Sequence, residues 1–371
     1  MESFDYQPRT RVIFGAGSLD RLGEAARSLG GTRALVVSDP GITATGYTAR
    51  AVKELEAVGL NAFRFTEVEQ DPTTRHVDAG LAAAREHQID LIVGLGGGSS
   101  MDCAKGINLL LTNGGRIEDY RGYGKATRPM LPMIGVPTTA GTGSEAQSYA
   151  VIADATTRVK MACGDPKAAF RVAILDPQLT LSQPAYVTAT SGFDAIAHAV
   201  EATVTTRRTA VSDCFAREAW RLLDASYETV LDRPDDVEAR AAMHLGAFYA
   251  GLAIEQSMLG AAHACANPLT ARYQMTHGVA LAILLPHVVQ WNSAVAASLY
   301  RRLLPPTDDA GGDPGERLAT RLRALGRHAG LPDRLRTEGV DPADLPQLAD
   351  AAAGQWTGTF NPRPLTAVDA L

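Results

Sequence analysis

The sequence predicts an α/β domain built on a parallel sheet, followed by a domain that is all α-helix. Up to about Pro184, short β-branched runs alternate with helical stretches, which is the pattern of a parallel sheet covered by helices. Beyond that point, Ala- and Leu-rich segments with helical spacing take over. The 371-residue chain exceeds what one hydrophobic core supports. We therefore expect two domains, residues 1–182 and 183–371.

The expected strands are short apolar runs, several of which end in Gly, Pro, Thr or Asp, where ligand-binding loops would lie. They are residues 34–38, 62–65, 91–94, 133–137 and 172–175. The expected helices of the second half are residues 185–203, 212–231, 236–254 and 314–328.

Composition and charge argue against several classes of partner. The chain is 46% hydrophobic and 20% charged, as in an ordinary soluble protein, and its net charge of −6 gives no attraction to nucleic acid. The most apolar late stretch, 279–289, is interrupted by Pro286 and His287, so we expect no membrane-spanning segment. The N-terminus lacks the pattern of a secretory signal, and the four cysteines form no CxxC pair. We expect a cytoplasmic protein with reduced, buried thiols.

A glycine-rich turn follows the expected strand that begins near Leu91. Gly97, Gly98 and Ser99 lie where this strand passes into a helix. Glycines let the backbone approach a pyrophosphate, and the helix N-terminus favours its negative charge. The turn therefore predicts a phosphate site in a Rossmann-like domain, although such turns also serve as plain connections.

A second polar loop, 138–145, follows the next expected strand. The hydroxyls of Thr138, Thr139 and Thr142 can bond a diphosphate, a ribose or the nicotinamide amide. The alternative is an N-capping turn in which Thr142 or Ser144 begins the next helix, and both readings are compatible.

Asp39 ends the strand 34–38, where a carboxylate can accept hydrogen bonds from an adenosine ribose. The same charge repels a 2′-phosphate, which favours NAD over NADP. The alternative is that Asp39, which precedes Pro40, only forms a turn.

A metal site is predicted in the helical half. Asp194 and His198 are four residues apart and so share one helix face, although such pairs are also common at surfaces and caps. His263 and His277 lie in apolar surroundings, where a buried imidazole needs a partner. One carboxylate with three imidazoles suits Fe²⁺ or Zn²⁺ and does not choose between them. Such an ion can polarise a carbonyl, and a dinucleotide beside it implies hydride transfer.

These motifs together resemble the iron-containing (group III) alcohol dehydrogenase family, within the dehydroquinate synthase-like superfamily. The resemblance covers nearly the whole chain, through residues 12–17, 96–105, 137–145, 194–198, 277–287 and 361–364. It implies an N-terminal dinucleotide-binding domain and a C-terminal helical domain, with cofactor and metal in the cleft between them. It also implies a homodimer or a higher homo-oligomer.

Carried over residue by residue, the resemblance implies a metal held by Asp194, His198, His263 and His277. The implied cofactor contacts are Asp39, Asp71, Gly97, Gly98, Ser99, Thr138, Thr139, Thr142 and Lys160. The implied substrate pocket includes Gln147, Tyr149 and Ile254. Asp71 stands where the family often carries Asn.

A second departure lies one helical turn after His263. The family usually has another histidine there, thought to assist proton movement, and this chain has Asn267. An amide cannot shuttle a proton near neutral pH. We therefore expect the proton to move through water or the cofactor ribose.

The function expected from these features is a metal-dependent, NAD(H)-linked alcohol dehydrogenase or aldehyde reductase acting on small aldehydes and primary alcohols. The alternatives are a maleylacetate reductase-like enzyme or another reductase of a functionalised aldehyde, a lyase of the dehydroquinate synthase type, and a non-catalytic cofactor-binding homologue.

Overall fold

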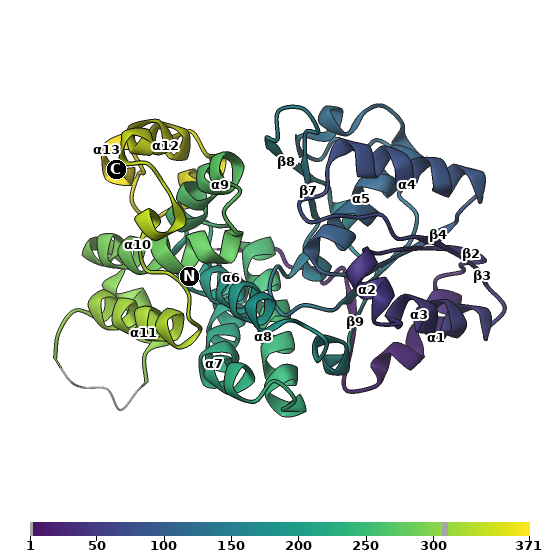
Figure 1. The fold of residues 1–371 in the computed structure, drawn as a ribbon, viewed down its shortest axis with the longest axis horizontal. Coiled ribbons are helices and arrows are strands. Elements are labelled where there is room, and N and C mark those ends of the chain that lie inside the picture. Colours follow the sequence, from purple (N-terminus) through teal and green to yellow (C-terminus); the bar gives the residue numbers. More distant parts are fainter. Residues whose placement is uncertain (1–2, 306–310) are drawn as a thin grey trace. The chain divides into compact units, whose positions relative to one another are not determined.

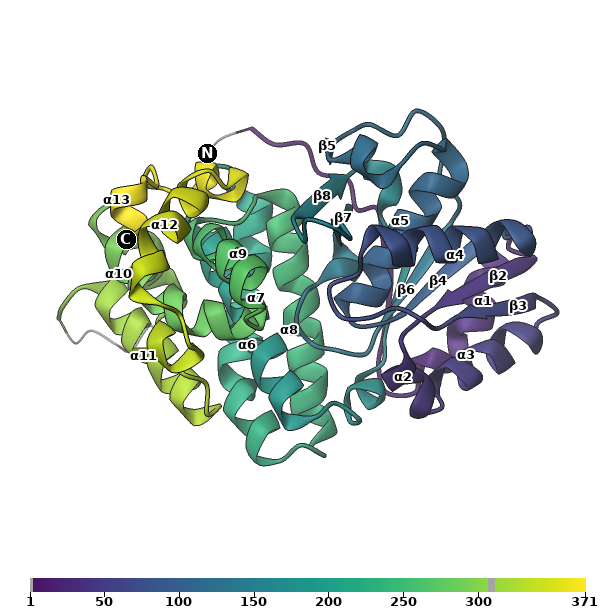
Figure 2. The same cartoon turned by 45° about the horizontal axis from the view of Figure 1, so that its top comes forward.

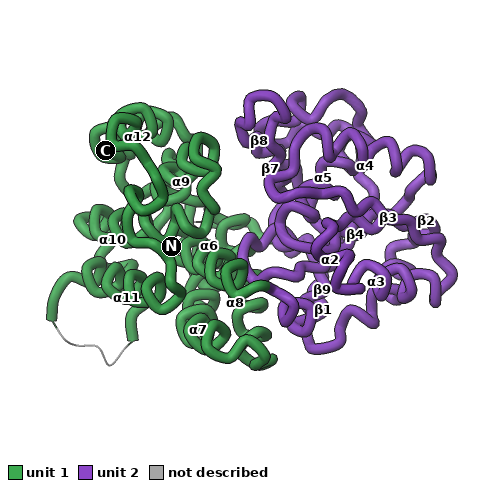
Figure 3. Tube along the Cα trace, in the orientation of Figure 1, with its two compact units in different colours: residues 1–6, 184–371 green, residues 7–183 purple. Residues whose placement is uncertain are grey.

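The computed structural model describes residues 3–305 and 311–371, and the chain divides into two compact units (Figure 3). Gln7–Gln183 form one unit, which carries the sheets. The other unit consists of the chain up to Tyr6 together with Pro184–Leu371, and it is helical.

The larger sheet has the strand order β1-β9-β6-β4-β2-β3, and all neighbouring strands are parallel. Its strands are β1 (Arg11–Phe14), β2 (Arg33–Val37), β3 (Asn61–Phe65), β4 (Leu91–Gly96), β6 (Met133–Pro137) and β9 (Val172–Leu175). The carboxyl ends of β2, β4 and β6 are neighbours, so the loops that follow these strands leave the same edge of the sheet.

Helices cover both faces of this sheet (Figure 2). Leu35 and Val37 of β2 pack in one core with α4 (Thr74–Glu86) and α5 (Gly98–Asn113). Ala34 and Val36 pack in another core with α1 (Leu22–Ser28) and α3 (Tyr47–Glu56). Alternate residues of a strand point to opposite faces, so a strand buried on both sides is apolar throughout.

A smaller sheet has the order β5-β8-β7, with strands Gly122–Tyr123, Lys160–Gly164 and Tyr149–Ala153. Neither it nor β1 was expected from the sequence. β1, β5 and β8 are short or interrupted by polar residues, whereas Tyr149–Ala153 is an apolar run of strand length that the sequence analysis missed. The short helix α2 (Pro40–Ala44) follows β2.

The helical unit is built around α6, which packs against α7, α8 and α10 (Figure 1). Its helices are α6 (Ala185–Val204), α7 (Ala210–Asp232), α8 (Val237–Gln256), α9 (Ala261–Tyr273), α10 (His277–Tyr300), α11 (Pro314–His328), α12 (Leu345–Ala353) and α13 (Ala367–Ala370). The predicted fold class, a parallel α/β part followed by an all-helical part, is confirmed.

The helix α10 corrects one prediction. From the sequence, Pro286 and His287 were expected to interrupt the apolar stretch 279–289, but the helix runs through both residues without a break. The proline costs the helix one backbone hydrogen bond, and tertiary packing compensates for this loss. By length and composition the segment His277–Leu303 could cross a membrane, but 61% of its apolar window is buried inside the protein. A core helix meets the same criteria.

The cysteines also differ from expectation in one respect. All four thiols are free, and Cys103 and Cys163 are buried, as expected. Cys265, on α9, is only partly buried, and Cys214, on α7, is exposed instead. Cys214 lies on the outer side of an amphipathic helix, where a single cysteine carries no signal of burial.

The start of α10 lies very close to α6. Gly278 is the second residue of α10, and a Cβ atom there would overlap the carbonyl oxygen of Thr190 on α6. Only glycine allows the two backbones to approach to this distance. The contact therefore fixes where the first turn of α10, including His277, lies relative to α6.

We predict that Gly278→Ala lowers the free energy of unfolding by about 1–3 kcal/mol, the usual cost of forcing atoms into a packed core. Gly326→Ala in α11 is the matched control, because a Cβ at that position meets only Phe193 at 3.7 Å. The control should be neutral or up to about 1 kcal/mol more stable. Urea unfolding followed by circular dichroism measures both, and equal effects of the two substitutions would contradict the role given to Gly278.

Candidate functional site

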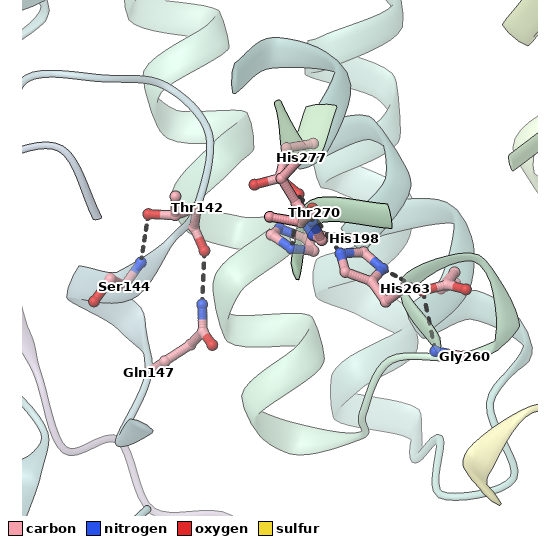
Figure 4. A network of polar contacts seen from close by, with 10 residues as sticks. Thr142, Ser144, Gln147, His198, Gly260, His263, Thr270 and His277 are labelled. Atoms are coloured by element: carbon pink, nitrogen blue, oxygen red, sulfur yellow. Dashed lines mark hydrogen bonds and ion pairs between the residues drawn. The ribbon is translucent and has the colours of Figure 1, made fainter. Parts of the chain in front are cut away.

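Three helices of the helical unit supply the predicted metal ligands. Asp194 and His198 come from α6, His263 from the first turn of α9, and His277 is the first residue of α10. The four-residue spacing of Asp194 and His198 places both on one face of α6, as the sequence predicted. Figure 4 shows the imidazoles of His198, His263 and His277 gathered together.

The three imidazoles surround one carboxylate oxygen. Oδ1 of Asp194 lies 3.3 Å from Nε2 of His198, 3.5 Å from Nε2 of His263 and 4.0 Å from Nε2 of His277. One ligand atom each from Asp194, His263 and His277 lie within 4.8 Å of one another. The rings of His198 and His263 stack with their centroids 4.9 Å apart.

Burial makes this cluster a good fit to a divalent cation. Asp194, His198 and His263 are buried, and the side chain of His277 is 28% exposed. Within the described residues, Oδ1 of Asp194 and Nε2 of His263 are buried without a hydrogen-bond partner. Unsatisfied buried polar atoms are rare in native proteins. An ion coordinated by this oxygen and these nitrogens would satisfy them, and the donor set suits Fe²⁺ or Zn²⁺.

The electrostatics agree with a cation site. Burial alone would raise the pKa of Asp194, but the imidazoles of His198, His263 and His277 hold this pKa well below its ordinary range. The carboxylate is therefore ionised at neutral pH. Burial likewise acts to lower the pKa of His263, and the carboxylates of Glu201 and Asp194 overcome it and raise this pKa to about 9.

Glu201 belongs to the cluster and was missed in the sequence. It lies on α6, one turn beyond His198, and its Oε2 is 2.5 Å from Nδ1 of His263. Its spacing from Asp194 and His198 puts it on the same side of α6, which was the available signal. A helical motif Asp-x3-His-x2-Glu therefore contributes three polar groups to this region.

Asn267 lies one turn after His263 on α9, as expected from its spacing. Its amide Nδ2 donates to Oε1 of Gln355 at 3.2 Å. On the next turn of the helix, the hydroxyl of Thr270 lies 3.4 Å from Nδ1 of His277 (Figure 4). The side chain at 267 is thus tied to another neutral amide.

The predicted cofactor loops leave the shared edge of the parallel sheet. Asp39 follows β2, Gly97 and Ser99 follow β4, and Thr138 follows β6. Because β6, β4 and β2 are adjacent, these loops are neighbours. The helix α5 begins after Gly97 without a side-chain cap, which leaves its first amides to bind an anion.

The two glycine- and threonine-containing loops pack closely. A Cβ at Gly98 would lie 2.7 Å from Cγ2 of Thr142, and one at Gly97 would lie 3.4 Å from Cγ2 of Thr139. The hydroxyl of Thr142 accepts a hydrogen bond from the Ser144 amide at 3.3 Å (Figure 4), but the N-cap of the short 3-10 helix Ser144–Ala146 is Gly143, so neither Thr142 nor Ser144 is the N-cap residue given as the alternative.

Asp39 forms the turn that the sequence analysis gave as the alternative to ribose binding. Its Oδ1 accepts a hydrogen bond from the Ile42 amide at 2.9 Å and so caps α2. Its Oδ2 accepts from the hydroxyl of Ser100 at 3.3 Å. The carboxylate therefore lies next to the start of α5, where the phosphate site is expected.

Asp71 and Lys160 form an ion pair with 2.6 Å between Oδ1 and Nζ. Lys160 begins β8, and Asp71 lies in the loop before α4 with a φ of 53°. Asparagine adopts this left-handed conformation readily, and aspartate does so nearly as well. The pairing brings two predicted cofactor contacts together.

The predicted pocket residues lie in different environments. Gln147 donates from Nε2 to the Thr142 carbonyl at 2.7 Å (Figure 4), and Tyr149 of β7 packs against Tyr123 with the ring centroids 5.6 Å apart. Ile254 of α8 is 4% exposed and packs in an apolar cluster with Ala202, Ala216 and Ala253.

Comparison with known proteins agrees with this arrangement. The sequence profile described as iron-containing alcohol dehydrogenase matches residues 8–177, and the C-terminal profile of the Fe-containing alcohol dehydrogenase family matches residues 188–371. The chain is 32% identical to an NAD-dependent methanol dehydrogenase of Bacillus methanolicus, over 96% of this chain and 95% of that protein. It is 34% identical to a 1,3-propanediol dehydrogenase of Klebsiella pneumoniae, over 97% and 95%.

A solved structure of a 1,3-propanediol oxidoreductase has the same fold. It is 33% identical, superposes with a TM-score of 0.95, and the match covers 100% of this chain and 98% of that one. The profile matches and the identity over nearly the full length thus agree with the motifs and the fold. The chain belongs to the iron-containing alcohol dehydrogenase family.

Proposed function

We propose that this protein interconverts small aldehydes and primary alcohols with NAD(H), using a divalent ion held by Asp194, His198, His263 and His277. Family membership confirms the predicted class of enzyme, an NAD-linked, iron-type alcohol dehydrogenase. The observation that carries the ligand assignment is the convergence of three imidazoles on the buried oxygen of Asp194.

The ligand residues have distinct roles in this proposal. A bound divalent ion supplies a Lewis acid for the substrate oxygen, and the nicotinamide gives or takes the hydride. Asp194 provides one negative charge, and the neutral imidazoles add none, so the donor set leaves part of a divalent charge uncompensated. His277, the most exposed of the four side chains, marks the side from which the cluster is reached.

The cofactor is held by the loops at the shared sheet edge. We assign the pyrophosphate to the amides after Gly97, with Gly98 and Ser99 at the start of α5. The hydroxyls of Thr138, Thr139 and Thr142 extend this site. Lys160 and Asp71 bind the cofactor sugar through their charged groups, and Asp39 accepts hydrogen bonds from the adenosine ribose.

Gln147, Tyr149 and Ile254 are proposed to shape the substrate pocket. For the proton, Asn267 offers only hydrogen bonds, so we assign its movement to water or to the cofactor ribose. We also propose a homodimer or a higher homo-oligomer, to be measured by light scattering, and a cytoplasmic location, which the four free thiols favour.

The metal assignment predicts that activity follows metal content. Purified enzyme treated with a chelator should stop oxidising NADH with every aldehyde of a small panel, and anaerobic Fe²⁺ should restore activity. His263→Ala should lower kcat by at least about 100-fold, because it removes a ligand and one of the three imidazoles that compensate the buried charge of Asp194. His287→Ala is the matched control, since this histidine lies outside the cluster. A chelated enzyme that keeps full activity contradicts the proposal.

The assignment of Asp39 to the adenosine ribose predicts that its charge makes the enzyme prefer NADH to NADPH. Removing its charge should raise the ratio of kcat/KM with NADPH to that with NADH by about tenfold or more, which corresponds to about 1.4 kcal/mol. Asp39→Asn keeps an oxygen for the Ile42 amide, whereas Asp39→Gly removes it. If the charge decides, both variants shift the ratio; an unchanged ratio in both would remove Asp39 from cofactor recognition.

The role proposed for Asn267 predicts that substituting this residue has only a small effect on catalysis. Asn267→Ala should lower kcat less than about tenfold, because the amide neither carries a proton nor replaces a ligand. Asn267→His should leave the pH profile of kcat unchanged if the proton uses water or the ribose. A loss in Asn267→Ala as large as that in His263→Ala would instead give Asn267 a direct role.

A further inference from the structure

We propose that Glu201 is a positioning residue for the metal: its carboxylate fixes the tautomer of His263 and sets where the first turn of α9 lies. This inference rests on the metal centre proposed above. Glu201 is not among the predicted ligands, and its carboxylate faces Nδ1 of His263, whereas Nε2 of that ring faces Asp194.

Both oxygens of the carboxylate are engaged at the start of α9. Oε2 accepts a hydrogen bond from the Gly260 amide at 3.0 Å and lies 2.5 Å from Nδ1 of His263. Oε1 accepts a hydrogen bond from the Ala262 amide at 2.6 Å. Glu201 and His263 are each 3% exposed, so water competes little for these contacts.

The contact with Glu201 selects one tautomer of His263. An ionised carboxylate only accepts hydrogen bonds, so Nδ1 of His263 must carry the proton in this contact. In the neutral ring, Nε2 then keeps its lone pair, and this nitrogen lies 3.5 Å from Oδ1 of Asp194. The other tautomer would place a hydrogen on Nε2 and block coordination there.

The same carboxylate replaces a missing helix cap. The residue before α9, Gly260, provides no side chain, and α9 has no side-chain cap of its own. Glu201 supplies this cap from α6, the helix that also carries Asp194 and His198. One buried side chain thus links the ligands on α6 to the ligand on α9.

A glutamine at position 201 cannot reproduce these contacts. If its NH₂ group replaces Oε2, this donor faces two other donors, Nδ1–H of His263 and the Gly260 amide. His263 can accept a hydrogen bond from it only with the ring proton on Nε2, which is the tautomer that blocks coordination. If its NH₂ group replaces Oε1, it faces the Ala262 amide, and two donors oppose each other. Either orientation disturbs the position or the tautomer of His263.

The test compares metal affinity in full-length apo protein reloaded with Co²⁺ in competition with a chelator. Glu201→Gln should weaken Co²⁺ binding by about 10- to 100-fold, the usual effect of losing such a partner of a metal-bound histidine. The visible Co²⁺ spectrum reports the ligand geometry. NADH binding, measured by fluorescence, should remain within about threefold of the wild type, because the predicted cofactor residues belong to the other unit.

Asn361→Ala is the matched control. Oδ1 of Asn361 accepts a hydrogen bond from the Ala261 amide at 3.3 Å, and its amide group also bonds Asn292 and the Arg363 carbonyl, so this variant removes several buried contacts, one of them at the same helix start, without touching an imidazole. It should lower the unfolding midpoint but change Co²⁺ affinity less than about threefold. An equal loss of affinity in the two variants would mean that Glu201 acts only through the fold, which overturns the proposal.

A measurement on the wild-type protein is independent of whether the variants fold. In Zn²⁺-loaded protein with ¹⁵N-labelled histidine, the signal assigned to His263 by its loss in His263→Gln should show the proton on Nδ1. A proton on Nε2 overturns the proposal, as does wild-type affinity in Glu201→Gln. If the wild type binds neither Co²⁺ nor Zn²⁺, the metal centre itself fails, and this inference fails with it.

Discussion

The buried carboxylate of Asp194 is the constraint on which the helical unit depends. A buried charge is costly unless it is compensated, and here three imidazoles from three different helices surround it. The helices α6, α9 and α10 must therefore meet at one point. Gly278 lets α10 approach α6, and Glu201 ties α6 to the start of α9, so backbone contacts and ligand positions are determined together.

In the sheet-containing unit, the main constraint is apolar packing and not a buried charge. Its parallel strands bury apolar side chains on both faces, which leaves the loops at their carboxyl ends to carry polar groups. The adjacency of β2, β4 and β6 brings Asp39, Gly97 and Thr138 to one edge. Backbone amides at α5 and a carboxylate at Asp39 are suited to two adjacent groups of a dinucleotide, the pyrophosphate and the adenosine ribose.

Local patterns in the sequence were sufficient for the parts of the structure with strong periodicity. The central strands and the helices α6, α7, α8 and α11 were predicted within a few residues, because their apolar spacing is long and regular. The helices α9 and α10 were not, since Pro268 and Pro286 lie inside them and only tertiary packing offsets these residues. Spacing along a helix pointed to Asp194 with His198, and the apolar surroundings of His263 and His277 pointed to these two histidines, before the family resemblance implied the same four ligands. Glu201 was missed because its partners at Gly260 and Ala262 are some sixty residues away in the sequence.

The central claim is that one oxygen of Asp194 and the imidazoles of His198, His263 and His277 hold a single divalent ion. X-ray absorption at the iron edge of anaerobically Fe²⁺-loaded protein tests it most directly. The account predicts one ion per chain, a first shell of nitrogen and oxygen, and the multiple scattering of about three imidazole rings. A spectrum with sulfur in the first shell, or without imidazole scattering, would contradict it.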